Sequence, residues 1–212
     1  DDEKFKVEGD AFEINITKKW NLISVPFTLQ NNAMGAVFDS HNDTIVSVWS
    51  YDAQTGLWHI YTPDGIPNDD LLTMKAGDGY CVLALEDDTL LVGGSLFSPV
   101  QVPPSKPVVG DAWNLLGYYG TENEPGYYGP EGNGDEARCA LYSLGDTVWD
   151  NAFSAVQSYW EPLNPHQWNT HHPYPGPIGL NRYDRMDPGA GYWVFPTEDG
   201  VYAPSTTCGF ID

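Results

Sequence analysis

An internal repeat constrains this chain more than any other feature of its sequence. Three motifs occur twice in the same order, as Trp20-Asn21-Leu22-Ile23, Val48-Trp49-Ser50-Tyr51 and Gly77-Asp78-Gly79-Tyr80, and again as Trp113-Asn114-Leu115-Leu116, Val156-Gln157-Ser158-Tyr159 and Gly189-Ala190-Gly191-Tyr192. The offset between equivalent residues grows from 93 at the first motif to 112 at the last, so the second copy contains insertions. Because each copy of a repeat is expected to form one structural unit, the sequence predicts two tandem homologous domains, residues 1–102 and 103–212.

The local patterns favour β-structure in both copies. Apolar and polar residues alternate over residues 12–17, which is typical of a strand with one exposed face. Residues 45–51 and 57–61 flank a turn-forming segment and predict a hairpin. Residues 80–85 and 90–92 predict a second hairpin.

Helical signals are limited to residues 33–40 and their counterpart at 140–144. We therefore expect a mainly β fold of two tandem homologous β-sandwich or barrel-like domains with little helix. Residues retained in both copies are expected to serve folding, which places Trp20, Trp49, Tyr80, Trp113 and Tyr192 in the core. The repeated Gly-x-Gly elements predict a tight turn that leads into an aromatic strand.

The two insertions of the second copy, residues 118–136 and 160–181, are the expected location of any ligand or partner site. They follow a proline-rich linker at residues 102–107, and long loops without their own secondary structure are often functional. Aromatic rings in such loops can stack on sugars, or they can pack the loops onto the domain. The candidate residues for glycan or partner binding are Tyr118, Tyr119, Tyr127, Tyr128, Trp160, Trp168 and Tyr174.

The charge of the chain excludes some partners. Its 30 acidic and 9 basic residues give a net charge of −21, and no Lys or Arg lies between Trp20 and Met74. Such a field repels nucleic acid and anionic lipid. No apolar run reaches the roughly 18–20 residues of a membrane span, so no direct membrane insertion is expected.

The repeated motifs together resemble a domain found on surface and secreted proteins of archaea, notably methanogens, and of some bacteria. The resemblance covers residues 11–97 and 110–205 and departs at Cys81, where that family usually has Trp. It implies an extracellular, S-layer-associated or adhesive protein of a cell envelope. It carries over no catalytic residues.

The residues offer two kinds of candidate metal site. His166, His171 and His172 offer imidazole ligands of the kind that zinc or copper takes, although exposed loop histidines fit the pattern as well. Calcium prefers oxygen ligands on turns, and the candidates are Asp39, Asn42, Asp43, Asp64, Asn68, Asp69 and Asp70. We expect no cofactor, with calcium as the possible exception, because the same residue types also populate turns without any metal.

Cysteines and sequons bear on the compartment. Cys139 and Cys208 are the preferred disulfide pair, and Cys81 is expected to be buried. Asn15 and Asn42 begin Asn-x-Thr sequons and are glycosylation candidates, which favours an extracellular setting. The opening residues Asp1-Asp2-Glu3-Lys4 fit a mature extracellular segment or a cytosolic protein equally well.

The sequence thus predicts an acidic, extracellular glycoprotein of the cell surface that acts in structure or adhesion, without catalysis. Its expected partners are other envelope proteins or glycans. The alternative is a carbohydrate-binding module that uses the loop aromatics, and a remote alternative is a metal-dependent enzyme. The Gly-x-Ser-x-Gly and His-Glu-x-x-His motifs do not occur in the sequence.

Overall fold

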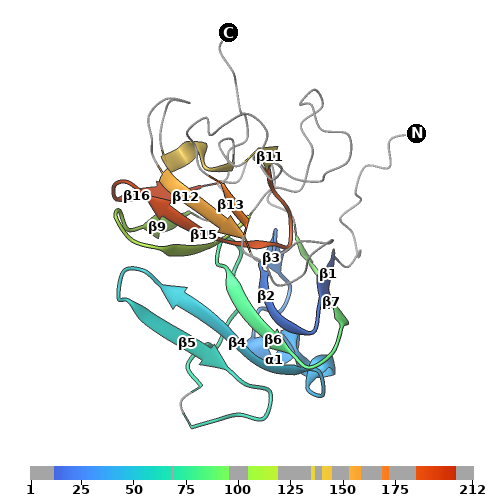
Figure 1. The fold of residues 1–212 in the computed structure, drawn as a ribbon. Helices are drawn as coiled ribbons and strands as arrows, with labels where there is room; N and C mark the ends of the chain where they lie inside the picture. Colours follow the sequence, from blue (N-terminus) through green and yellow to red (C-terminus); the bar gives the residue numbers. More distant parts are fainter. Residues whose placement is uncertain are drawn as a thin grey trace, which may run out of the picture.

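The computed structural model describes residues 12–67, 69–95, 105–118, 135–136, 140–144, 153–158, 169–171 and 185–203. Within these ranges the chain forms several small antiparallel sheets (Figure 1). The helices of the described residues are short turns, among them α1 (Met34–Val37), η1 (Asp39–His41) and η2 (Tyr142–Leu144). The prediction of a mainly β fold with little helix is confirmed.

The first half of the chain is built around one four-stranded sheet. Its strands, in the spatial order β2-β6-β4-β5, are β2 (Lys19–Ile23), β6 (Tyr80–Ala84), β4 (Ile45–Asp52) and β5 (Leu57–Tyr61). Two further pairs are β1 (Phe12–Ile16) with β7 (Asp88–Val92), and β3 (Thr28–Leu29) with β8 (Gly94–Ser95).

The second half contains a four-stranded sheet of corresponding order. Its strands, in the order β10-β15-β12-β13, are β10 (Asn114–Gly117), β15 (Gly191–Pro196), β12 (Phe153–Ser158) and β13 (Asn169–His171). Two further pairs are β9 (Lys106–Val108) with β16 (Gly200–Tyr202), and β11 (Asp135–Glu136) with β14 (Arg185–Met186). In both sheets the strand that comes last along the chain, β6 or β15, lies between the two strands that come first. β6 pairs with β2 and β4, and β15 pairs with β10 and β12.

The pairing register places the repeated motifs at matching positions. Asn21 lies opposite Val82 in the first sheet, and Asn114 lies opposite Val194 in the second. The second strand of each sheet also has an irregularity at its start, between Ile45 and Ser47 and between Phe153 and Ala155.

The asparagine of the Trp-Asn-Leu motif closes the turn before its strand. The Asn21 side chain accepts from the Thr17 amide at 2.9 Å and donates to the Thr17 carbonyl at 2.7 Å. Asn114 makes the same two bonds with Val109, each at 2.9 Å. Both asparagines are buried, so these bonds satisfy polar groups that water does not reach.

The Gly-x-Gly-Tyr motif also has a structural explanation. Gly77 and Gly189 adopt φ of 85° and 83°, a region that favours glycine. The tyrosine that follows each turn is buried, and its hydroxyl accepts a hydrogen bond from the amide at the start of the turn. These bonds run from Lys75 to Tyr80 at 2.7 Å and from Asp187 to Tyr192 at 2.6 Å. The predicted tight turns are confirmed.

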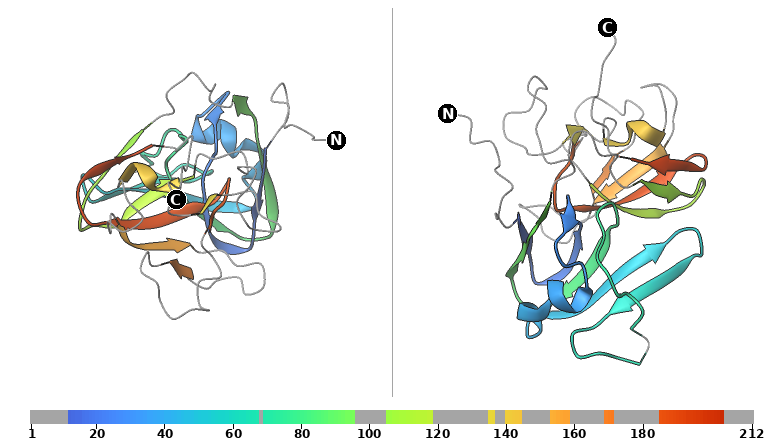
Figure 2. Two further views of the ribbon diagram at one scale, coloured as in Figure 1. Left: turned by 90° about the horizontal axis from the view of Figure 1, so that it is seen from above. Right: turned by 180° about the vertical axis from the view of Figure 1, so that it is seen from behind.

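Each half has its own hydrophobic core. In the first, Ile14 and Leu90 of the β1–β7 pair pack with Val48 and Val82 of the four-stranded sheet. The second core has Val108 and Tyr202 from the β9–β16 pair and residues of β10 and β15. The right-hand view in Figure 2 shows the two sets of strands as neighbouring bodies.

Two expectations drawn from the sequence are wrong. Strands β6 and β7 do not form a hairpin, because β6 pairs with β2 and β4 whereas β7 pairs with β1. The chain instead passes from the four-stranded sheet to the β1–β7 pair, and this places Leu90 and Val92 of β7 in the first core. The shared tryptophans are also not core residues: Trp20 is 41% and Trp113 36% exposed, while Tyr80 and Tyr192 are buried as predicted.

The two halves are joined by a reciprocal set of backbone contacts. The Ser24 amide, just after β2, donates to the Gly189 carbonyl at 2.9 Å, and the Gly117 amide at the end of β10 donates to the Gly77 carbonyl at 2.9 Å. β-Bridges pair Ile23 with Ala190 and Leu116 with Asp78. Each half therefore binds the Gly-x-Gly turn of the other.

The second glycine of each turn lies at this contact. A Cβ on Gly191 would approach the Ile23 carbonyl oxygen at 2.8 Å, and a Cβ on Gly79 would approach that of Leu116 at 2.7 Å. Both distances are shorter than normal packing allows. Neither residue can be replaced without moving one half away from the other.

We expect Gly191→Ala to lower the free energy of unfolding by about 1–3 kcal/mol, the usual cost of overpacking. Gly93→Ala is the matched control, because a Cβ there meets nothing within 4 Å. Urea denaturation followed by fluorescence measures both variants. Equal midpoints for Gly191→Ala and the control would contradict the close contact described here.

Candidate functional site

The most prominent aromatic feature of the described residues lies where the two halves meet. We call it the junction cluster, and it consists of Trp49 and Tyr51 of β4, Trp58 of β5 and Trp193 of β15. Trp49 and Tyr51 are two residues apart in one strand and so share a face. Tyr51 lies directly opposite Trp58 in the β4–β5 ladder.

The rings of the junction cluster hold one another in place. Tyr51 lies 5.2 Å from Trp58 and 5.6 Å from Trp193 between ring centroids, and Trp58 lies 5.7 Å from Trp193. The interplanar angles of these pairs, 50° to 67°, are tilted or edge-on arrangements of the kind that aromatic pairs prefer. Trp58 nevertheless remains 47% exposed.

A rigid hairpin turn borders the cluster. Asp52 accepts hydrogen bonds from the Gln54 amide and the Thr55 hydroxyl, each at 2.9 Å, and Gly56 completes the turn at φ 70°. Burial tends to raise the pKa of Asp52, but these hydrogen bonds outweigh it and hold the pKa below its usual value. The side chains of Gln54 and Thr55 are exposed at the tip.

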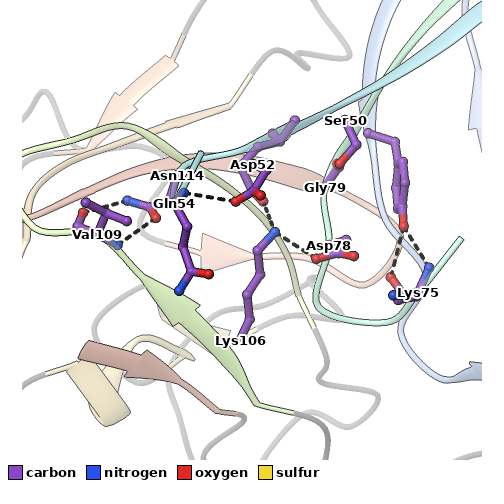
Figure 3. Close-up of polar contacts among 11 residues, drawn as sticks. Ser50, Asp52, Gln54, Lys75, Asp78, Gly79, Lys106, Val109 and Asn114 are labelled. Atoms are coloured by element: carbon purple, nitrogen blue, oxygen red, sulfur yellow. Dashed lines mark hydrogen bonds and ion pairs between the residues drawn. The ribbon is translucent and has the colours of Figure 1, made fainter. Parts of the chain in front are cut away.

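An ion pair joins the two halves beside this turn. Lys106 of β9 contacts Asp78 of the first Gly-x-Gly turn at 2.7 Å and donates to the Leu115 carbonyl at 2.8 Å (Figure 3). Both side chains are partly buried, at 20% and 29% exposure. The charge of Lys106 is thus already neutralised within the protein.

The structure describes few of the predicted loop aromatics. Tyr118 is buried in the second core, in contrast to the expectation of an exposed loop ring. The other six candidates lie outside the described residues: Tyr119, Tyr127, Tyr128, Trp160, Trp168 and Tyr174. The same is true of His166 and His172, while the backbone of His171 lies in β13.

The calcium candidates are distributed over two turns. Asp39, Asn42, Asp43 and Asp64 are exposed, and Asn68 lies outside the described residues. Among the residues that the structure describes, no group of three or more His, Cys, Asp or Glu side chains is arranged to hold a metal.

Asp69 and Asp70 instead hydrogen bond to an edge strand. Strand β5 lies at the edge of its sheet, where unpaired backbone groups invite association with other chains. Asp70 accepts from the Ile60 amide at 2.9 Å and contacts His59 at 2.8 Å, and Asp69 accepts from the Thr62 amide at 3.1 Å. The Ile60 amide is the largest cause of the lowered pKa of Asp70, followed by His59.

A second carboxylate network lies near the predicted Asn42 sequon. Asp88 accepts a hydrogen bond from the Thr44 hydroxyl at 2.5 Å and pairs with His41 at 2.7 Å. Burial raises the pKa of Asp88, but the hydrogen bonds from Thr44 and His41 lower that pKa by more than burial raises it. The net shift of the pKa is therefore downward. This network ties the η1 turn to β7.

The cysteine and sequon candidates can be placed in part. Cys81 is free and half-buried, and burial raises the pKa of its thiol to about 12, so it stays protonated at neutral pH. Cys139 and Cys208 lie outside the described residues. Asn15 and Asn42 are both exposed.

Sequence reasoning missed the junction cluster as a surface feature. Trp49 was expected in the core and is only half-buried, and Tyr51 and Trp58 were recognised only as strand residues. The available signal was the replacement of Cys81 in the first copy by Trp193 in the second, because a ring present in one copy alone cannot be required by the shared fold.

Comparison with known proteins adds nothing to these observations: no family model, curated protein or solved structure matches the chain. Within the described ranges, no helix has both the length and the apolar character needed to cross a membrane.

The edge-strand contacts predict a local effect of Asp70→Ala. The Ile60 amide loses its acceptor, so its hydrogen exchange should accelerate while exchange of the core strand β6 stays unchanged. Exchange mass spectrometry on peptides covering residues 57–62 measures this. Asp64→Ala, at an exposed residue of the same loop, is the control, and equal exchange in both variants would show that Asp70 does not protect the strand.

The depressed pKa of Asp88 predicts a pH dependence. A carboxyl whose pKa is lower in the folded state stabilises the protein above its unfolded pKa of about 3.9, and this contribution is lost as the pH falls through the folded value. Asp88→Asn should therefore reduce the free energy of unfolding by about 1–2 kcal/mol at pH 7, with a smaller difference below about pH 4. Denaturation at both pH values tests this; a difference that does not change with pH would contradict it.

Proposed function

We propose that this chain is an extracellular, non-catalytic structural or adhesive protein of an archaeal cell envelope, of the S-layer-associated kind. The observation that carries the proposal is the reciprocal binding of each half to the Gly-x-Gly turn of the other. It joins two separate cores through backbone hydrogen bonds and the Lys106–Asp78 ion pair. Such a joined unit suits a protein that holds its shape while it contacts neighbours.

We further propose that the halves are two homologous tandem domains of sandwich-like architecture. Support comes from the matching strand order of the four-stranded sheets and from the equivalent bonds of Asn21 and Asn114. In each half a two-stranded pair contributes residues to the same core as the four-stranded sheet.

An extracellular setting is supported by the exposure of both sequon asparagines, Asn15 and Asn42. An oligosaccharide attached at either position would project into solvent without disturbing the cores. The carbohydrate-binding alternative is favoured by a different observation, the exposure of Trp58 in a preformed aromatic cluster.

The proposed location can be tested on intact cells that produce the protein. Treatment with a membrane-impermeant biotin reagent should label this chain but not a cytosolic marker. Mass analysis of the recovered protein should show glycan on peptides that contain Asn15 or Asn42. Labelling only after the cells are broken would contradict the envelope role.

A further inference from the structure

We propose that the junction cluster is a binding face for an uncharged glycan, with Trp58 and Tyr51 as the rings on which a sugar stacks. This inference rests on the proposed interaction role and names the class of partner that one surface takes. It places the site at the contact between the halves, away from the loop aromatics that the sequence suggested.

The rings are fixed, although Trp58 is exposed and Tyr51 is only partly buried. Trp58 keeps about half of its surface in solvent, although it contacts Trp49, Tyr51 and Trp193. A side chain held by its neighbours loses little rotational freedom when it binds, so the face is preorganised. Because the rings are tilted relative to one another, they form an angled aromatic surface on which the apolar face of a pyranose can rest.

Polar groups border the rings. The Asp52–Gly56 turn continues directly from Tyr51 and presents the exposed side chains of Gln54 and Thr55. Amide and hydroxyl groups of this kind can exchange hydrogen bonds with sugar hydroxyls. Apolar rings with a few fixed polar groups are the usual lining of a small-molecule site.

The surrounding charge selects against acidic ligands. No Lys or Arg lies between Trp20 and Met74, and the lowered pKa of Asp52 keeps that carboxylate negative at neutral pH. Lys106 is already paired with Asp78 and the Leu115 carbonyl. Among the residues that the structure describes, the imidazole beside Trp58, that of His59, is likewise paired with Asp70. A phosphate, sulfate or uronate group would therefore meet repulsion from the surrounding carboxylates.

A protein partner fits the face less well. A stable protein–protein interface takes about 800 Å² from each partner and has an apolar centre. Here a few rings end at an exposed polar turn. The rings alone match the face of one or two sugar units better than the broad contact that a protein makes.

The test is a binding screen on the full chain with neutral hexasaccharides of glucose, mannose, xylose and N-acetylglucosamine, read by tryptophan fluorescence and calorimetry. At least one should bind, while hexagalacturonate and a heparin hexasaccharide should bind more weakly. Trp58→Ala should weaken binding about fivefold or more, by analogy with base stacking on aromatic rings. Trp20→Ala removes an indole of similar exposure outside the cluster and should leave the affinity within about twofold, as expected for a residue that makes no ligand contact.

Gln54→Ala, at the exposed tip of the turn, is a second variant whose sugar affinity can be measured even if Trp58→Ala does not fold. It should also weaken binding. The inference is overturned if no neutral hexasaccharide binds, if Trp58→Ala and Gln54→Ala both bind as well as the parent, or if the anionic sugars bind more tightly. Binding of cytochrome c, a basic protein, that requires Trp58 while the sugars fail would assign the face to a protein partner. None of these outcomes bears on surface labelling of intact cells, so the two proposals can fail separately.

Discussion

The structure depends on two carbonyl oxygens, those of Gly77 and Gly189, each of which accepts an amide hydrogen from the opposite half of the chain. These bonds can form only because the glycine two residues further on lets the neighbouring strand approach the turn. Everything else at the junction follows from that approach. It brings Trp193 against Tyr51 and Trp58, and it places Lys106 against Asp78. It also packs Leu115, which is buried but belongs to neither core cluster, against Gly79.

Local patterns predicted the strands better than their partners. Alternation over residues 12–17 and the Asp52–Gly56 turn each specify a conformation within a few residues, and both are found as expected. Residues 80–92 show the limit of that reasoning. Two apolar runs separated by a short polar segment fit a hairpin or a crossing between two sheets equally well, and burial of Leu90 against Ile14 decides for the crossing. That contact depends on residues more than seventy positions away.

The candidate site was less predictable for the same reason. Tyr51 and Trp193 come from different copies, and no motif indicates that their rings meet. Retention in both copies predicts burial, yet Trp20 and Trp113 are exposed, while the small asparagine beside each is buried and hydrogen bonded. Carboxylates were considered as calcium ligands, but Asp69 and Asp70 bind amides at an edge strand. Composition cannot distinguish these two uses of an acidic turn.

The reciprocal contact also has a consequence for how the chain is made. The turn at Gly79 leaves the ribosome 112 residues before Gly191 does. At roughly 5–20 residues per second, the first half waits on the order of 5 to 20 seconds for its partner. During that interval the end of β2 and the Asp78 turn have none of the contacts that the second half provides, and Tyr51 and Trp58 lack Trp193. The first half therefore emerges with an aromatic face that the second half does not yet cover.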